Sequence, residues 1–276
     1  KYKAGLHQQK VVLENFLSEE LNTVRDQVLL EELFENALTL IKNNKAVLPI
    51  EDLDDKRIAY VNLGDADGGP FLRELRKYAA VDWITAARLT DLQDKLSDYD
   101  LVILGYHKSN NSPWASYKFS PAELHWIHQV AQENKTILSL FSSPYALNDL
   151  RGLNELDGIL VNYQNHEVAQ EKAAQLIFGA IEAKGKLPVS IGTNFPEGTG
   201  YQTNNLERLS YGLPESVGLN SYKLNRIDSI ISEAIDEKMT PGAQILVARK
   251  GKIVYNKNFG YHTYEKELPV TDSTIY

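Results

Sequence analysis

The sequence predicts an α/β fold: an open, mostly parallel sheet with helices on both faces, a three-layer sandwich, followed by a C-terminal helix and β-hairpin. Three observations predict it. Between residues 58 and 183, short apolar runs alternate with longer segments of helical periodicity, which is the order of α/β proteins. These runs are continuously apolar, as in parallel strands that are buried on both faces. Near the end, a Lys250-Gly251 turn separates two further apolar runs, the pattern of a hairpin.

The elements follow in order along the chain. Helices are expected at 27–43, from Pro70 onward, at 89–96, behind Ser120, at 165–183 and at 221–238. Strands are expected between them, at 58–63, 81–84, 101–106, 136–141 and 158–162, and the hairpin at 245–248 and 253–255.

Several helix ends carry recognisable signals. The first helix places Leu30, Leu33, Ala37 and Ile41 on one face, at helical spacing. Proline suits the first helical position, so Pro70 opens a helix, and Ser120-Pro-Ala-Glu123 reads as a capping box. Gly185 is expected to end the long helix 165–183, since glycine favours the position after a helix.

Three parts are predicted along the chain. Residues 1–30 read as a connecting arm, 31–215 as the α/β domain, and 219–276 as the start of a further domain. The boundary lies after a loop-rich stretch, 186–215, that holds many glycines and prolines. A helix and one hairpin make a poor core by themselves, so 219–276 is expected to be part of something larger.

Composition excludes several classes of protein. The 276 residues carry a net charge of −8, whereas nucleic-acid binders present basic surfaces. No apolar run reaches the length of about 18 residues that spans a bilayer. The absence of cysteine excludes disulfides and thiolate metal sites. No cofactor is expected, and no metal either: His125 and His128 are three apart on one helix, where a metal pair is usually four apart with a third ligand elsewhere, so a solvated face is the favoured interpretation.

Candidate site residues follow the predicted strands, because ligands bind at the carboxyl ends of parallel strands. Asp65 begins the turn Asp65-Ala-Asp-Gly-Gly-Pro70, which either contacts a ligand or is simply a polar turn before a helix. His107 follows the 101–106 strand, where it is a possible acid or sugar contact or merely a surface-loop histidine. Tyr145 follows the 136–141 strand in Ser-Ser-Pro-Tyr, whose serines favour a turn because a nucleophile-elbow pattern is missing. No catalytic residue is predicted.

Four stretches together resemble the C-terminal α/β domain of glycoside hydrolase family 3. They are Lys1-Tyr-Lys-Ala-Gly-Leu6, similar to the end of the preceding barrel; Leu33–Pro49, with its Ala-x-Thr-Leu-x-Lys-Asn and Leu-Pro patterns; Thr136–Leu147, a strand followed by Pro-Tyr; and Gly185-Lys-Leu-Pro-Val-Ser-Ile191. The resemblance spans about residues 1–215.

This resemblance implies a parent glycosidase with a TIM barrel upstream. The nucleophilic aspartate then belongs to the barrel, and this chain alone is expected to be inactive. In β-glucosidase-like members a carboxylate of the α/β domain is the acid/base, whereas in β-N-acetylglucosaminidase-like members it is a barrel histidine. No carboxylate here matches the first arrangement, so the second is preferred and the first stays an alternative.

Residues 219–276 resemble the start of a serine β-lactamase-like domain, through Met239–Ala248, Gly251-Lys-Ile-Val-Tyr255 and Pro269–Tyr276. The Ser-x-x-Lys, Tyr/Ser-x-Asn and Lys-Thr-Gly elements of that family are missing. Together the resemblances imply an accessory domain between a barrel and a serine hydrolase, processing peptidoglycan-derived sugars outside the cytoplasm. Two rival functions are a carbohydrate-binding module that binds glycan by itself and a structural scaffold between its neighbours.

Overall fold

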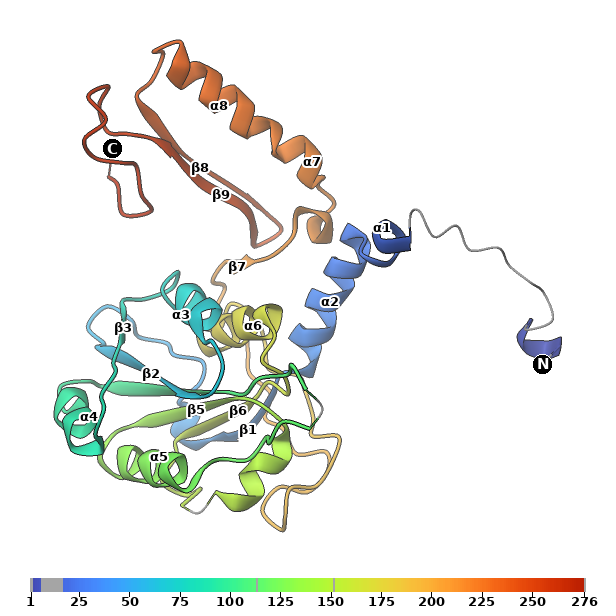
Figure 1. Cartoon of the computed structure of the whole chain (residues 1–276), viewed down its shortest axis with the longest axis vertical. Coiled ribbons are helices and arrows are strands. Elements are labelled where there is room, and N and C mark those ends of the chain that lie inside the picture. Colours follow the sequence, from blue (N-terminus) through green and yellow to red (C-terminus); the bar gives the residue numbers. More distant parts are fainter. Residues whose placement is uncertain (1, 6–16, 113, 151, 276) are drawn as a thin grey trace.

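The computed structural model describes residues 2–5, 17–112, 114–150 and 152–275. Its main body is the predicted α/β sandwich around a six-stranded sheet of order β1-β6-β5-β4-β2-β3 (Figure 1). Strands β2 to β6 run parallel, and β1 joins the edge antiparallel to β6. The strands are β1 (Thr39–Asn43), β2 (Ile58–Gly64), β3 (Val81–Trp83), β4 (Leu101–His107), β5 (Thr136–Phe141) and β6 (Gly158–Val161).

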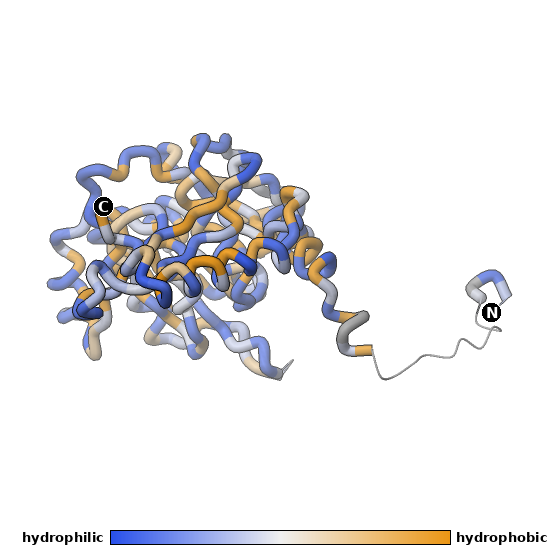
Figure 2. The backbone as a smooth tube through the Cα atoms, turned by 90° about the horizontal axis from the view of Figure 1, so that it is seen from above, coloured by the Kyte–Doolittle hydropathy of each residue, from blue (hydrophilic) through white to orange (hydrophobic). Residues whose placement is uncertain are grey.

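Helices cover both faces of this sheet. They are α3 (Gly69–Leu75), α4 (Leu89–Leu96), α5 (Pro121–Glu133) and α6 (Glu167–Ile177). The short 3-10 helices η3 (Asn44–Ala46) and η4 (Pro144–Asp149) lie in the β1–β2 and β5–β6 connections. Helices α3 and α6 share one buried cluster with inward-facing strand residues such as Ile103, and α4 and α5 share the other with residues such as Val102. Successive strand residues therefore face opposite cores, which explains the continuously apolar runs. Figure 2 shows these hydrophobic stretches inside hydrophilic loops.

The N-terminal arm contains η1 (Tyr2–Ala4), α1 (Leu17–Leu21) and α2 (Val24–Ala37). The prediction of one helix over 27–43 is wrong beyond Ala37, because the chain turns at Leu38 and enters β1. Leu38, Leu40 and Ile41 are at most 1% exposed. A short apolar run with β-branched residues fits a buried strand as well as a helix, and pairing with β6 decides for the strand.

The observed helix ends confirm the predicted capping box and correct the predicted end of the long helix. Ser120 and Glu123 form the reciprocal capping box of α5, as predicted. The long helix ends at Ile177 rather than near Gly185. Gly179 adopts the left-handed backbone that ends helices, with φ of +68°, and Leu206 packs so closely that a Cβ on Gly179 would lie 2.7 Å from its Cγ.

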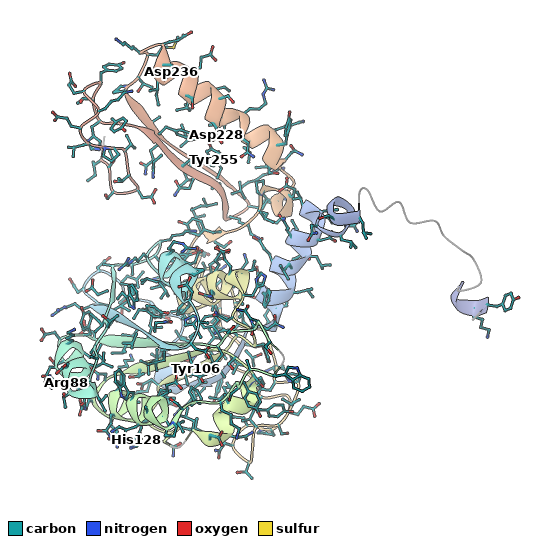
Figure 3. The ribbon with its side chains drawn as sticks, in the orientation of Figure 1. Arg88, Tyr106, His128, Asp228, Asp236 and Tyr255 are labelled. Atoms are coloured by element: carbon teal, nitrogen blue, oxygen red, sulfur yellow. The ribbon has the colours of Figure 1, made fainter. Side chains whose placement is uncertain are left out.

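A second, smaller unit follows the sandwich. It contains η5 (Pro214–Val217), α7 (Ser221–Leu224), α8 (Arg226–Asp236) and the hairpin of β8 (Gly242–Arg249) and β9 (Lys252–Gly260). The predicted hairpin is confirmed, and its turn residues Lys250 and Gly251 both have positive φ, as tight hairpin turns require. The Tyr255 hydroxyl donates to Asp228 at 2.5 Å, which ties β9 to α8 (Figure 3).

A short strand, β7 (Ser210–Tyr211), lies before the predicted boundary and pairs in parallel with β9. The loop-rich stretch therefore contributes to the sheet of the second unit. The division at 215–219 stays a prediction. No described helix combines the length and apolar character needed to cross a bilayer.

Candidate functional site at the carboxyl ends of the strands

The carboxyl ends of β2 and β4 form the topological switch point of the sheet. The chain leaves β2 for β3 on one side and then crosses to β4 on the other, and ligands bind in such crevices in open α/β sheets. Asp65 directly follows β2, and His107 is the last residue of β4. The backbone N–H groups of Asp65 and Ala66 both donate to the carbonyl oxygen of His107, at 3.0 and 3.2 Å. The fold thus brings two predicted site residues together.

His107 does not lie in a surface loop, which corrects that interpretation. It is 0% exposed. Its Nε2 lies 2.9 Å from the Tyr60 hydroxyl, its Nδ1 lies 2.7 Å from Asn165 Oδ1, and its ring stacks on Phe141 with centroids 4.4 Å apart. Burial lowers the pKa of His107 to about 4, since a charged imidazole loses its hydration there. His107 is therefore a neutral imidazole at physiological pH.

Asn165 and Gln170, which bond to each other at 3.0 Å, hold the turn that follows β2. Asn165 and Gln170 both donate to the carbonyl oxygen of Asp67, at 3.3 and 3.1 Å. Gly68 lies against the same group, and a Cβ there would meet the Tyr60 hydroxyl at 2.1 Å. This close approach explains why the turn needs glycine. The buried polar cluster fixes the backbone from which Asp65 projects.

Asp65 anchors the loop that follows β4. Its carboxylate pairs with Lys108 Nζ at 2.6 Å and accepts from the Ser109 N–H at 3.0 Å. The hydrogen bond from Lys108 lowers the pKa of Asp65, and the bond from Ser109 adds to the effect. An aspartate with a lowered pKa is ionised near neutral pH, so Asp65 has no proton to donate as a general acid there.

A hollow of about 410 Å³ opens beside this pair, which we call the strand-end hollow. Neutral hydroxyl and amide side chains dominate its wall, and no carboxylate is among the lining residues. The lining residues are Lys108, Ser109, Asn110, Ser112, Ala115, Ser116, Tyr117, Ser142, Ser143, Tyr163 and Gln164. Groups of this kind can exchange hydrogen bonds with a neutral polyhydroxylated ligand.

Tyr163 lines the hollow in a strained conformation. Its φ is +65°, which is rare for a bulky residue and costs about 1–3 kcal/mol. Its hydroxyl lies 2.8 Å from Thr39 Oγ1, which holds the ring at the end of β6. Strain of this kind concentrates at binding sites, which supports a functional role for the hollow.

The third predicted residue, Tyr145, lies in η4 and is 41% exposed. It does not line the strand-end hollow, although its neighbours Ser142 and Ser143 do. Ser142 donates to the carbonyl oxygen of Tyr117 at 3.2 Å, which links β5 to the loop after β4. Ser142 thus serves loop geometry, in line with the predicted turn role.

The two helical histidines lie on α5 and do not line the strand-end hollow. His128 Nδ1 lies 2.5 Å from Glu155 Oε2, and His125 is exposed. Within the described ranges, no cluster of three or more histidine, aspartate or glutamate side chains has the geometry to hold a metal ion.

Comparison with known protein families shows which family this domain belongs to. The model of the glycosyl hydrolase family 3 C-terminal domain matches residues 38–222, about two thirds of the chain. The chain belongs to this family. The family 3 domain therefore covers the whole sandwich and the strand-end hollow.

Solved structures show the same fold. A fungal multi-domain GH3 β-N-acetylglucosaminidase is 24% identical in sequence, with a TM-score of 0.52. The match covers 67% of this chain and 21% of the fungal chain. The β-glucosidase of Listeria innocua in complex with isofagomine is 15% identical in sequence, with a TM-score of 0.52. The match covers 65% of this chain and 29% of the Listeria chain. The family 3 domain is thus similar to one part of much longer enzymes.

A curated relative, Protein flp of Staphylococcus aureus, is 35% identical over 51 residues. The match covers 18% of this chain and 10% of that protein. The chain therefore spans about a tenth of the curated relatives that it matches.

Sequence reasoning missed Lys108, Tyr163, Asn165 and Gln170. Lys108 sits directly after His107, in a serine- and asparagine-rich segment, and that polar run behind a buried strand was the available signal. Asn165 and Gln170 join the site only because β6 and α6 return beside β4 and β2, which the linear pattern does not show.

Proposed function

We propose that this family 3 domain is the accessory wall of a glycosidase active site, with the bond-breaking residues in an upstream barrel. The strand-end hollow carries the proposal. Its wall offers hydroxyls and amides for sugar hydroxyls, and the nearest predicted carboxylate, Asp65, is tied to Lys108 and Ser109. The chain alone would then bind without cleaving.

A β-N-acetylglucosaminidase is the parent that we favour. In a β-glucosidase-like parent, a carboxylate of this domain would reach the sugar, and no carboxylate lines the described hollow. The loop after β4 also presents Trp114, 91% exposed, close in sequence to the lining residue Tyr117. Aromatic faces offer apolar surface to the C–H side of a sugar ring.

We further propose that the parent acts on peptidoglycan-derived sugars outside the cytoplasm. The support is the resemblance of 219–276 to the start of a serine β-lactamase-like domain, which would place a serine hydrolase downstream. A glycosidase joined to such a domain suits the processing of muropeptide fragments.

The deciding experiment compares this chain with a version extended upstream through its barrel, using chromogenic β-N-acetylglucosaminide and β-glucoside. We expect turnover of the first substrate by the extended protein only. Turnover by the chain alone would overturn the accessory role. Preference for the glucoside, together with loss of turnover in Asp65→Asn, would establish the β-glucosidase alternative.

Variants of the hollow test whether it contacts sugar. In the extended protein, Gln164→Ala should raise KM about two- to tenfold, the effect of one lost hydrogen bond, and leave kcat nearly unchanged. Gln129→Ala is the control, because Gln129 lies on α5 and bonds to Gln132. An unchanged KM for both Gln164→Ala and Asn110→Ala would contradict a sugar-binding hollow and favour a scaffold.

A further inference from the structure

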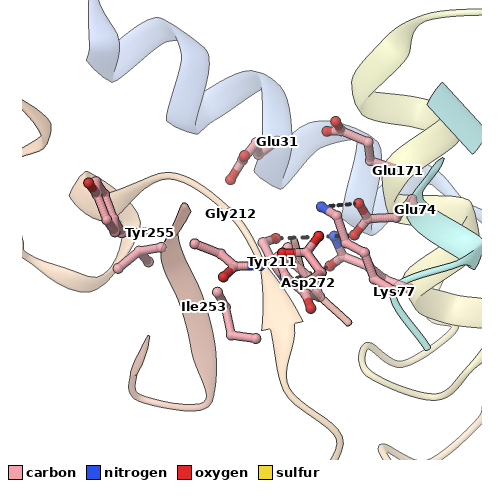
Figure 4. A pocket seen from close by; sticks show the side chains of 12 residues that line it. Glu31, Glu74, Lys77, Glu171, Tyr211, Gly212, Ile253, Tyr255 and Asp272 are labelled. Carbon is pink, nitrogen blue, oxygen red and sulfur yellow. Dashed lines mark hydrogen bonds and ion pairs between the residues drawn. The ribbon is translucent and has the colours of Figure 1, made fainter. Parts of the chain in front are cut away.

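A second cavity lies where the sandwich meets the hairpin unit. It has a volume of about 370 Å³, and we call it the junction pocket. Glu31 of α2, Glu74 of α3 and Glu171 of α6 line it from three helices (Figure 4). Tyr211 of β7 and residues 253–256 of β9 line it as well. The proposed glycosidase role makes no use of these residues.

Strand β7 connects the two units through alternate backbone groups. The N–H groups of Ser210 and Gly212 donate to the hairpin, to the carbonyl oxygens of Gly251 and Ile253 at 3.0 and 3.2 Å. The N–H of Tyr211 instead donates to Gln175 Oε1, and that of Leu213 to Glu31 Oε2, both at 3.3 Å. The N–H groups of Ser210 and Gly212 therefore probe the pairing with the hairpin, whereas those of Tyr211 and Leu213 probe the contact with the sandwich.

Side chains of α6 complete this attachment. Lys172 Nζ and Gln175 Nε2 both donate to the carbonyl oxygen of Tyr211, at 2.9 and 3.2 Å. Gln175 also donates to Glu74 at 2.8 Å, and Lys77 pairs with the other oxygen of Glu74 at 2.6 Å. The Lys77 ammonium lies 4.1 Å from the centre of the Tyr211 ring. The junction therefore depends on a charged network.

Carboxylates outnumber ammonium groups around this network. Those facing it are Glu31 and Glu35 of α2, Glu74 of α3, Glu167 and Glu171 of α6 and Asp272 beyond β9, against Lys77, Lys172 and Lys252, with Arg73 paired to Glu167 at the rim. The pKa values of Tyr211 and Tyr255 are raised by burial, so both stay neutral. Ionisation of one more carboxyl would add repulsion.

Glu171 is the carboxyl that titrates in the physiological range. Burial, and after it the nearby Glu74 charge, raise its pKa to about 7. The closed junction thus favours the protonated form. The contribution of Glu171 to the stability of the closed junction is fully present below the ordinary glutamate pKa of about 4.5, and it is lost as pH rises through about 7.

We propose that the junction is a proton-sensitive latch, in which protonated Glu171 lets β7 and the hairpin unit close on α3 and α6, and ionised Glu171 loosens them. The latch would adjust how firmly the second unit is held against the sandwich as pH changes between mildly acidic and mildly basic.

Hydrogen exchange of the 276-residue chain tests the latch. Protection factors, corrected for intrinsic exchange at each pH, would be measured at pH 5.5 and pH 8. We expect the protection of Tyr211 and Leu213 to be about tenfold lower at pH 8. Ser210 and Gly212 are internal references that should keep theirs, because they bond within the hairpin sheet.

Two variants assign the effect. Glu171→Gln should keep Tyr211 and Leu213 protected at both pH values, whereas the control Glu167→Gln, on the same helix, should keep the pH dependence. Retained protection of Gly212 shows that the variants fold. Equal protection in the unmodified chain at both pH values, or an undiminished decrease in Glu171→Gln, would overturn the proposal.

Discussion

The Nδ1 atom of His107 lies 2.7 Å from Asn165 Oδ1. An amide oxygen only accepts, so Nδ1 carries the proton of the neutral ring and Nε2 faces the Tyr60 hydroxyl as an acceptor. The single hydroxyl proton of Tyr60 therefore has two acceptors within reach, Nε2 at 2.9 Å and Asn62 Oδ1 at 3.0 Å. The imidazole thereby connects the end of β4 with Tyr60 of β2 and with Asn165 between β6 and α6. Its neutral form is the one that this buried cluster accommodates.

The first prediction concerns pH. Because the pKa of His107 falls from 6.5 unfolded to about 4 folded, the unfolded chain binds the extra proton. The contribution of His107 to stability is fully present above pH 6.5 and is lost as pH falls toward 4, by on the order of 3 kcal/mol. Urea unfolding from pH 7 to pH 4 should show this loss, and His107→Gln should show a shallower slope. Identical slopes would contradict the assignment.

Removing the imidazole should also weaken the fold at neutral pH. His107→Ala leaves a cavity and takes partners from Tyr60 and Asn165, which together cost about 2–4 kcal/mol. His125→Ala is the control, because His125 is exposed on α5 and should change stability by less than about 0.5 kcal/mol. Equal effects of the two changes in urea unfolding at pH 7 would show that the cluster is not a structural hub.

Much of the sandwich was predictable because its signals are local. The central parallel strands are largely apolar runs, and the Ser120 capping box marks the start of α5. In the second unit the Lys250-Gly251 turn is a local signal of the same kind. The strand β1 was mistaken for helix because Thr39 to Asn43 becomes a strand only through pairing with β6. Short apolar runs leave that choice to tertiary contacts.

The candidate site was predictable only in part, for a related reason. The rule about strand ends placed Asp65 and His107 at one edge of the sheet, and the fold joins them there. The burial of His107 could not be predicted from the sequence, because the residues that follow it, Lys108 and Ser109, are polar. Only packing against Phe141 and Tyr60 encloses the ring.

A helix cap supplies a third stability test. Ser120 Oγ accepts from the Glu123 N–H at 3.2 Å, and Glu123 accepts from the Ser120 N–H at 2.6 Å. Ser120→Ala should cost about 1 kcal/mol, because one orphan donor of α5 loses its partner. Thermal unfolding would measure the change, with Ser97→Ala as the control at the C-terminal end of α4. An unchanged thermal stability of Ser120→Ala would mean that solvent replaces the hydrogen bond of the cap.

The turn after β2 should not accept a side chain at Gly68. Its Cβ would meet the Tyr60 hydroxyl at 2.1 Å and His107 Nε2 at 2.7 Å, so Gly68→Ala must displace the buried cluster. We expect a loss of about 1–3 kcal/mol, typical of overpacking. Gly69→Ala is the adjacent control, since its nearest atoms are the flexible carboxylate of Asp67 and the tip of Arg73. Urea unfolding that ranks Gly69→Ala as the worse change would refute this packing argument.

Lys172 combines burial with charge, and its removal should be costly. Its side chain is 1% exposed, its Nζ donates to the Tyr211 carbonyl oxygen, and it lies 3.8 Å from Glu31 and 3.9 Å from Glu35. Lys172→Met preserves the volume but leaves Glu31 without its counter-charge, so we expect a loss of about 3 kcal/mol in urea unfolding. Lys184→Met, at an exposed pair with Glu182, should cost less than about 1 kcal/mol.

A double variant separates lost packing from the unpaired charge. If the uncompensated Glu31 carboxylate causes most of the loss, then Glu31→Gln should destabilise Lys172→Met little or even restore part of its stability, because the orphan charge disappears. Fully additive losses would instead show that Lys172 acts mainly through its hydrogen bond to Tyr211. In that case Lys172→Met would loosen β7 to the same extent with or without the Glu31 charge on α2. Comparing the single and double variants therefore shows whether the charge pair or the hydrogen bond to Tyr211 holds the hairpin unit on the sandwich.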